Sequence, residues 1–368
     1  MTKIKTILAG IDTLIVGYNI NGYALGDSEW YMLAEAKEAA KAIDFNPDGQ
    51  RIDFRGKLFS VLPTGTRMHK YILKNEDITL KIKPAANGGA AYPEIIVQYS
   101  SVFLWRGGYE LACTQFRDWL SSWAYVSGEI VSRVDLCGDV NAPLPELDRD
   151  FRELVTRAQG KETFQIQTFA RGLKLSGYVF GSGDCLCRVY DKVNEIETKS
   201  NKTWFYDLYR QNGWTDGEPV TRIEFQTRRK FLKSMQVTTL DDLLASIADL
   251  WVYLTEKWLS LRDQGNDSNR SRWAVKPYWA VVQGARRFFG KLSGVMRVRQ
   301  YRPKLAALRQ QARGVMVSMA AVVGASMGGN DSSSIGYQYV LQEFGRMLSE
   351  PFFKTDIKRR EAKMAAFS

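Results

Sequence analysis

The chain has 368 residues, of which 45% are hydrophobic and 25% charged, a composition typical of globular proteins with one large domain or two ordinary ones. No uninterrupted apolar run reaches the roughly 18 residues of a membrane span, and Asp12 interrupts the first apolar stretch, so we expect neither a membrane helix nor a secretory signal. The 4 cysteines fit no zinc motif or disulfide framework, which favours a reducing cytoplasm, and the single histidine, His69, excludes a site with several histidine ligands.

The first third of the chain alternates between predicted strands and two predicted helices. Strand patterns occupy residues 6–20 and recur between residues 57 and 100, where turn residues separate them. Helical periodicity appears at residues 28–43 and again at residues 109–123.

A second strand-rich block follows and then gives way to helices. We predict a helix at residues 198–212 between its last strands, a long amphipathic helix at residues 240–261, and a largely helical remainder. Strands joined by hairpins, with helices grouped beside them, indicate an α+β fold with a largely antiparallel sheet and flanking helices. The predicted organisation is a domain at residues 1–290, with sub-blocks at about 1–125 and 126–290, and a helical, basic C-terminal segment at residues 291–368.

The net charge of +11 is concentrated in one segment. Residues 268–330 contain 12 Lys and Arg and no acidic residue, which leaves 39 basic against 40 acidic residues elsewhere. Such asymmetry is typical of a surface that binds a polyanion, and the aromatic residues interleaved there favour nucleic acid because bases stack on such rings. A solvated basic face without a partner is the alternative.

Three predicted strands of the second block carry the same pattern. In each, an arginine comes two residues before a side chain that could act as a nucleophile, a base or a metal ligand. Residues i and i+2 of a strand share a face. The pairs are Arg133 and Asp135, Arg188 and Tyr190, and Arg222 and Glu224. If these strands are neighbours, one sheet face presents carboxylates, a tyrosine and several cations. A polar, solvated face with cross-strand ion pairs is the plain alternative.

The residues around Tyr190 allow a specific chemistry. A tyrosine, with an ordinary pKa of about 10, attacks phosphorus well only when nearby cations or a metal favour the phenolate. Asp135 and Glu224 are suitable oxygen ligands for Mg²⁺ or Mn²⁺, and Arg188 and Lys192 could hold non-bridging phosphate oxygens. Such a site would nick DNA through a phosphotyrosyl bond and keep the bond energy for rejoining.

These motifs resemble a known family. R-V-Y-D-K-x-x-E at residues 188–195, preceded by S-R-V-D-L-x-x-D at 132–139 and followed by T-R-I-E-F-Q at 221–226, is similar to the Rep_trans replication initiation factors. The G-I-D-T-L strand at 10–14 and R-W-x-V-x-P-Y-W at 272–279 add to the resemblance, which spans residues 7–289. The family includes initiators of rolling-circle plasmids and filamentous phages, and relaxases of integrative conjugative elements.

The resemblance implies nicking of one DNA strand, at an origin hairpin or single strand, by an Mg²⁺- or Mn²⁺-dependent tyrosine enzyme of the bacterial cytoplasm. It also implies a homodimer and recruitment of a host helicase. The predicted catalytic residues are Tyr190 as nucleophile with Arg188, Lys192 and Glu195, and the predicted metal ligands are Asp135, Glu224 and Asp139. Asp139 and Glu195 would look the same as ion-pairing or helix-starting acids. The predicted DNA contacts are Arg133, Arg222, Arg228, Arg229, Lys230, Arg286, Arg287 and Lys291.

Two other functions are compatible with the same residues. A non-catalytic DNA-binding protein on this scaffold would bind DNA in a salt-dependent way and form no covalent intermediate. A metal-dependent nuclease that uses water would release products free of protein, and its Tyr190→Phe variant would stay active. The intact Arg-x-Tyr-x-Lys motif favours the tyrosine enzyme.

Overall fold

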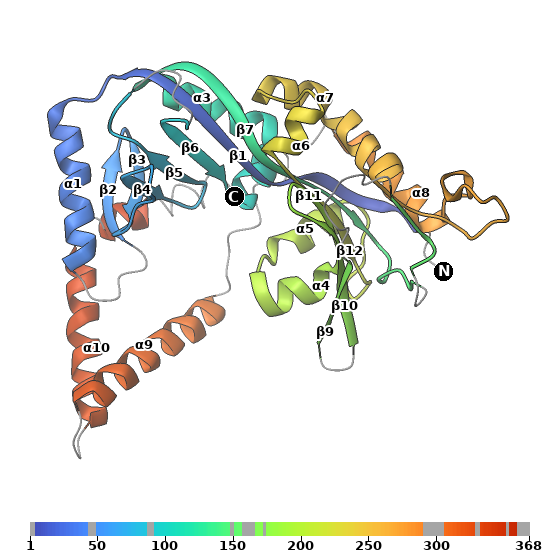
Figure 1. Cartoon of the computed structure of the whole chain (residues 1–368). Helices are drawn as coiled ribbons and strands as arrows, with labels where there is room; N and C mark the ends of the chain where they lie inside the picture. The colour runs from blue at the N-terminus through green and yellow to red at the C-terminus, as the bar shows by residue number, and fades with distance from the viewer. Residues whose placement is uncertain are drawn as a thin grey trace. The chain divides into compact units, whose positions relative to one another are not determined.

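The computed structural model of the chain describes residues 4–42, 49–86, 92–147, 151–156, 166–171, 174–289, 305–327, 332–350 and 353–358. Contacts between residues divide the chain into two units, residues 1–295 and residues 296–368. The first unit has an α+β fold with a large antiparallel sheet and flanking helices, which confirms the predicted class (Figure 1). No helix in the described ranges is long and apolar enough to cross a membrane.

One antiparallel sheet contains eleven of the strands found among these residues. In the order in which they pair, they are β2 (Gln50–Phe54), β3 (Lys57–Val61), β4 (Tyr71–Lys74), β5 (Ile78–Ile82), β6 (Ile95–Tyr99), β1 (Thr6–Tyr23), β7 (Ala124–Val140), β12 (Thr221–Arg228), β11 (Cys185–Asp191), β10 (Lys174–Ser182) and β9 (Ile166–Arg171). Two short strands, β8 (Leu154–Thr156) and β13 (Leu259–Leu261), pair separately.

The centre of the sheet is the long antiparallel pair β1 and β7. These strands have 18 and 17 residues and pair from Thr6 opposite Val140 to Tyr23 opposite Ala124, with several register shifts. Because β1 also pairs with β6, it links the early strands to the later ones. The two strand-rich blocks predicted from the sequence are therefore two halves of one continuous sheet.

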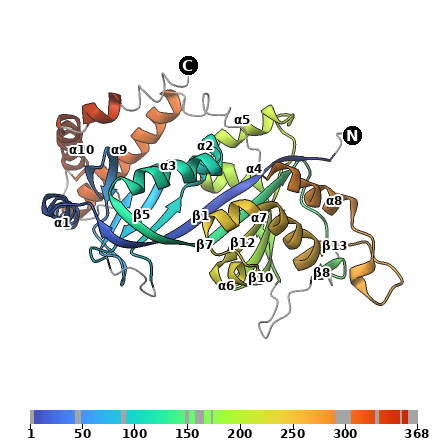
Figure 2. The same ribbon diagram turned by 90° about the horizontal axis from the view of Figure 1, so that it is seen from above.

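Helices cover both faces of the sheet. On one side lie α2 (Ser101–Gly107), α3 (Tyr109–Ser121), α4 (Lys192–Glu195) and α5 (Trp204–Gln211), and on the other lie α6 (Arg229–Ser234), α7 (Leu240–Tyr253) and α8 (Pro277–Gly284) (Figure 2). The two faces of β12 show this division, because successive strand residues point to opposite faces. Phe225 packs edge-on against Trp251 of α7, with ring centroids 5.7 Å apart, whereas Arg222, an odd number of residues earlier, has its guanidinium 4.5 Å from the ring of Phe205 in α5.

The early helices confirm their predicted positions, with small changes of boundary. The helix predicted at residues 28–43 is α1 (Asp27–Ala42), and that predicted at residues 109–123 is α3. The helix predicted at residues 198–212 is shorter, because a π-helical turn at Ile196–Ser200 precedes α5 and ends at Asn201. Asn201 has φ 51°, a left-handed conformation that asparagine tolerates better than most residues.

The long amphipathic segment at residues 240–261 is not one helix. Helix α7 begins with a capping box between Thr239 and Asp242, and a π-helical turn at Leu254–Trp258 then leads into β13. The carbonyl of Thr255 accepts hydrogen bonds from Trp279 Nε1 (2.8 Å) and Gln283 Nε2 (3.0 Å) of α8. These tertiary donors satisfy a carbonyl that a continuing helix would otherwise use, so the helix can end there.

The second unit is helical over its described residues, as the sequence predicts for the tail. Its main elements are α9 (Leu305–Met327) and α10 (Ser332–Ser349), which pack against each other. A Cβ atom at Gly336 would lie only 2.1 Å from the carbonyl oxygen of Ala320, so glycine permits this close approach.

Candidate active site

The strands that carry the arginine pattern are neighbours in the sheet, in the order β7, β12, β11. Arg188 lies opposite Glu224, and Tyr190 lies opposite Arg222. On the other side of β12, Asp135 lies opposite Gln226. Directly opposite residues of an antiparallel pair share a face, so these side chains form one polar face, which we call the tyrosine face.

Tyr190 lies at the centre of the tyrosine face and is half-buried. Its hydroxyl donates a hydrogen bond of 3.0 Å to Oε2 of Glu224. The other carboxylate oxygen of Glu224 accepts a 3.0 Å bond from Nη1 of Arg188, whose Nη2 donates to Oε1 of Gln226 at 3.1 Å. Glu224 therefore bridges the tyrosine and an arginine.

The electrostatics of this pair favour a neutral tyrosine in the free protein. Burial, and then the negative charge of Glu224, raise the pKa of Tyr190 well above its ordinary value of 10.0. Burial, together with the charges of Asp12 and Asp135, also raises the pKa of Glu224. A carboxylate with a raised pKa, bonded to the phenol, is a suitable acceptor for the tyrosine proton.

A buried ion-pair network lies beside the tyrosine. Arg222 is 0% exposed and donates to both oxygens of Asp139 from Nε and Nη2, each at 2.7 Å. Its Nη1 donates to Asp12 at 2.8 Å, and the hydroxyl of Tyr209 donates to Asp139 at 2.7 Å. Burial contradicts the prediction that Arg222 contacts DNA, because a fully enclosed guanidinium cannot reach a phosphate. The pairing of both Asp139 oxygens favours a structural role for that carboxylate.

Lys192 also lies inside the protein, although the sequence predicts that it holds a phosphate. It is 2% exposed, and its ammonium is 2.5 Å from Oε2 of Glu195. The same ammonium lies 5.8 Å from the ring centroid of Tyr190 and 4.9 Å from that of Phe205. Burial and the charge of Arg222 lower the pKa of Lys192. This placement favours a role in positioning the tyrosine ring rather than direct contact with a phosphate.

The end of β11 explains why Tyr190 and Lys192 take such different positions. Asp191 closes the strand and caps α4, because its Oδ1 accepts the N–H of Asn194 at 3.0 Å. The chain therefore turns from strand to helix directly after Tyr190.

The other predicted DNA contacts fall in three places. Arg133 lies on the tyrosine face and binds Asp135 through Nε (2.8 Å) and Nη2 (2.5 Å), and Arg228 lies directly opposite it at the exposed end of β12. Arg229 and Lys230 follow in α6. Arg286 and Arg287 are exposed, but their 3-10 turn, Ala285–Phe288, packs against the opposite face, where Gly138 approaches Ala285. Lys291 lies outside the described residues.

The two carboxylates of the tyrosine face and the neighbouring Asp12 of β1 are not arranged to fit a metal ion. Asp12 and Asp135 are near enough to Glu224 for their negative charges to raise its pKa. A divalent cation would relieve this repulsion. Each of the three carboxylates, however, binds an arginine, and within the described ranges no group of three or more His, Cys, Asp and Glu side chains could hold a metal. Use of Mg²⁺ or Mn²⁺ stays a prediction of the resemblance.

Sequence reasoning missed several residues of this region. Asp12 enters from β1, where it interrupts an apolar run, and a charge in a buried strand is a signal that a partner lies nearby. The period-two pattern of β12 does put Gln226 on the face of Glu224, but it gives no sign that Gln226 accepts a hydrogen bond from Arg188. Phe205 and Tyr209 come from α5, and no local pattern connects them to the strands.

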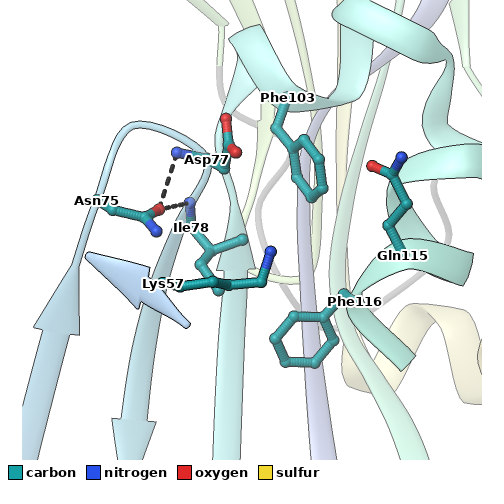
Figure 3. Close-up of a pocket in the computed structure, with 7 residues that line it drawn as sticks. All are labelled: Lys57, Asn75, Asp77, Ile78, Phe103, Gln115 and Phe116. Atoms are coloured by element: carbon teal, nitrogen blue, oxygen red, sulfur yellow. Dashed lines mark hydrogen bonds between the residues drawn. The ribbon is translucent and has the colours of Figure 1, made fainter. Parts of the chain in front are cut away.

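A pocket elsewhere in the first unit is separate from the tyrosine face. It has a volume of about 260 Å³ including its open mouth and is lined by Lys57, Asn75, Asp77, Ile78, Phe103, Gln115 and Phe116 (Figure 3). In it, Oδ1 of Asn75 accepts the backbone N–H groups of Asp77 and Ile78, both at 2.9 Å, which fixes the turn between β4 and β5. Neither a nucleophile nor a cluster of charges marks this pocket as a site of chemistry.

No family model matches the chain, and no curated protein matches it. A solved structure that is similar is a rolling circle replication initiator protein from Geobacillus stearothermophilus, with 16% sequence identity and a TM-score of 0.40, covering 77% of this chain and 97% of that chain. A likeness this weak carries no argument about function, so membership of the Rep_trans family stays a prediction from the motifs.

Proposed function

We propose that the chain nicks a single DNA strand by attack of Tyr190 on a phosphodiester. The observation that carries the proposal is the bond from the Tyr190 hydroxyl to the Glu224 carboxylate, beside the guanidinium of Arg188 on a half-exposed sheet face. A nucleophile bonded to a base that a third group orients is the arrangement that activates nucleophilic side chains.

The proposed reaction is a transesterification. Glu224 takes the phenolic proton as the tyrosine oxygen forms a bond to phosphorus, and the bond from phosphorus to the 3′-oxygen breaks. The 3′-oxygen leaves and takes a proton from solvent, and the phosphate remains on Tyr190. Arg188 and Tyr190 bind the same carboxylate, so Arg188 lies beside the attacked phosphate. Its planar fork matches phosphate geometry and could hold a non-bridging oxygen. The phosphotyrosyl bond retains the energy needed for rejoining a strand.

The test is formation of a covalent adduct. Single-stranded oligonucleotides tiled across both strands of the DNA that encodes the chain, and its flanks, are incubated with protein and Mn²⁺, with and without EDTA. The samples are run on a denaturing protein gel. We expect a shifted band with the wild-type chain that disappears in Tyr190→Phe.

Tyr206→Phe is the matched control. The Tyr206 hydroxyl is buried and has no hydrogen-bond partner among the described residues, so its removal should change neither the fold nor the adduct. Cleavage that survives in Tyr190→Phe would instead indicate a nuclease that uses water. DNA binding without an adduct on any oligonucleotide would indicate a non-catalytic DNA-binding protein. Metal dependence is read from the EDTA lane, and a homodimer and a helicase partner stay predictions.

A further inference from the structure

The tyrosine face is closed at one end and open at the other. At the closed end, helix α5 covers the sheet: Phe205 lies over the guanidinium of Arg222, and Tyr209 reaches Asp139, with Arg222 0% and Asp139 1% exposed. At the open end, β12 finishes with the exposed side chain of Arg228. A bound DNA strand with one phosphate at Tyr190 can therefore continue along the sheet only toward Arg228.

Arginines mark that open direction. Three arginines, which we call the arginine row, follow the sheet from Tyr190 toward the open end. Tyr190 lies opposite residue 222 of β12 and Arg188 lies opposite residue 224. The row ends where Arg133 lies opposite Arg228. With a rise of about 3.3 Å per strand residue, the row extends roughly 20 Å from Tyr190 and about 13 Å from Arg188. This length suits a segment of a few nucleotides.

The guanidinium groups form the outer layer of the row. The side chains of Arg188 and Arg133 are 33% and 28% exposed, whereas those of Glu224 and Asp135 beneath them are 10% and 2% exposed. An arginine has five N–H donors in a planar fork, so Arg133 can keep Asp135 on one edge and offer another donor outward. The backbone N–H of Arg228 donates to the carbonyl of Asp184, but its exposed side chain makes no hydrogen bond or ion pair with another described residue, so its guanidinium can bind a phosphate.

We propose that single-stranded DNA leaves Tyr190 along β12, with successive phosphates near Arg188 and then between Arg133 and Arg228. This path rests on the proposed function, because it takes the phosphate at Tyr190 as its starting point. Along it, three guanidinium groups face two carboxylates, which leaves a net positive row beside the nucleophile.

The test is the salt dependence of binding. A fluorescein-labelled, mixed-sequence single-stranded oligonucleotide is titrated by fluorescence anisotropy at several salt concentrations, with Tyr190→Phe as the parent so that no cleavage intervenes. Each lost phosphate contact lowers the log–log salt slope by about 0.7 for single strands. We expect a drop of about 0.7 in Arg133→Gln/Arg228→Gln, which removes both cations from the second phosphate, and a smaller drop in Arg228→Gln, which leaves Arg133 on that phosphate.

Lys257→Gln is the control, because Lys257 is exposed on the π-helical turn after α7, in the helix layer of the opposite face. Its slope should equal that of the parent. Equal slopes in Arg228→Gln, the double variant and the parent, with matching thermal melts, would overturn the path. A drop in Lys257→Gln as large as in Arg228→Gln would also overturn it.

The adduct assay separates this inference from the proposed function. If the wild type forms an adduct at Tyr190 but the salt slope is unchanged in Arg228→Gln, the DNA path is refuted and the nicking reaction is supported. A lower slope with no adduct on any oligonucleotide supports DNA binding along the row and overturns the nicking reaction.

Discussion

Replacing Arg222 by methionine should strongly destabilise the first unit. Arg222 is 0% exposed and donates two hydrogen bonds to Asp139 and one to Asp12. Methionine fills similar space but leaves both carboxylates without their main cation. Removal of one partner of a buried ion pair costs about 3–5 kcal/mol of unfolding free energy. Tyr209, Ser101 and Lys202 still reach the carboxylates, so we do not expect a larger loss.

The matched control is Arg210→Met in α5. Arg210 also pairs with two carboxylates, Asp207 at 2.8 Å and Asp216 at 2.7 Å, but its side chain is 47% exposed. Exposed ion pairs contribute about 0–1 kcal/mol, so this variant should unfold close to the wild-type urea midpoint. The assay is urea unfolding of both variants and the wild type, followed by far-UV circular dichroism and tryptophan fluorescence.

The pH dependence adds a second check on the same network. Although burial raises the pKa of Asp12, the charges of Arg222, Lys202 and Lys192 hold it well below its ordinary value of 3.8. A depressed carboxyl pKa stabilises the fold above the unfolded value and loses that contribution as the pH falls. The difference between wild type and Arg222→Met should therefore be full at pH 7 and shrink below pH 3.8. If Arg222→Met costs no more than Arg210→Met, the network is not the stabilising element that we describe.

Three further predictions concern the site and its support. Glu224→Gln should abolish the adduct yet raise the unfolding free energy at pH 7. The reason is that a carboxyl with a raised pKa destabilises the fold as the pH rises through the unfolded value of 4.5. Urea unfolding from pH 4 to 8 measures this difference, and a variant less stable than wild type at pH 7 would contradict it. Gly177→Ala should lower the adduct yield and cost about 1–3 kcal/mol, since a Cβ there would lie 2.9 Å from Cβ of Tyr190; unchanged adduct kinetics would show that the tyrosine position tolerates the shift. Thr239→Ala should remove the capping box of α7 and cost about 1 kcal/mol in urea unfolding without changing the adduct, so a loss of adduct would show that α7 affects the opposite face.

Local pattern was enough to predict the class of fold and the facing of the key side chains. The period-two alternation around Tyr190 placed it with Arg188, and the same alternation placed Arg222 with Glu224, because strand geometry alone decides which neighbours share a face. Helical periodicity also located α1 and α3 within a few residues. These features depend on residues close together in the sequence.

The tertiary structure decided what surrounds the tyrosine. Strand order and register set Glu224 against Arg188, brought Asp12 from the start of the chain to Arg222, and laid Phe205 of α5 over that arginine. Whether an arginine faces DNA or lies buried between carboxylates depends on which element covers it, and that cover comes from residues far away in the sequence. Alternation and the register of β11 and β12 together put Arg222 and Arg188 on the same face, and only the packing of α5 makes one an internal cation and leaves the other partly exposed to solvent.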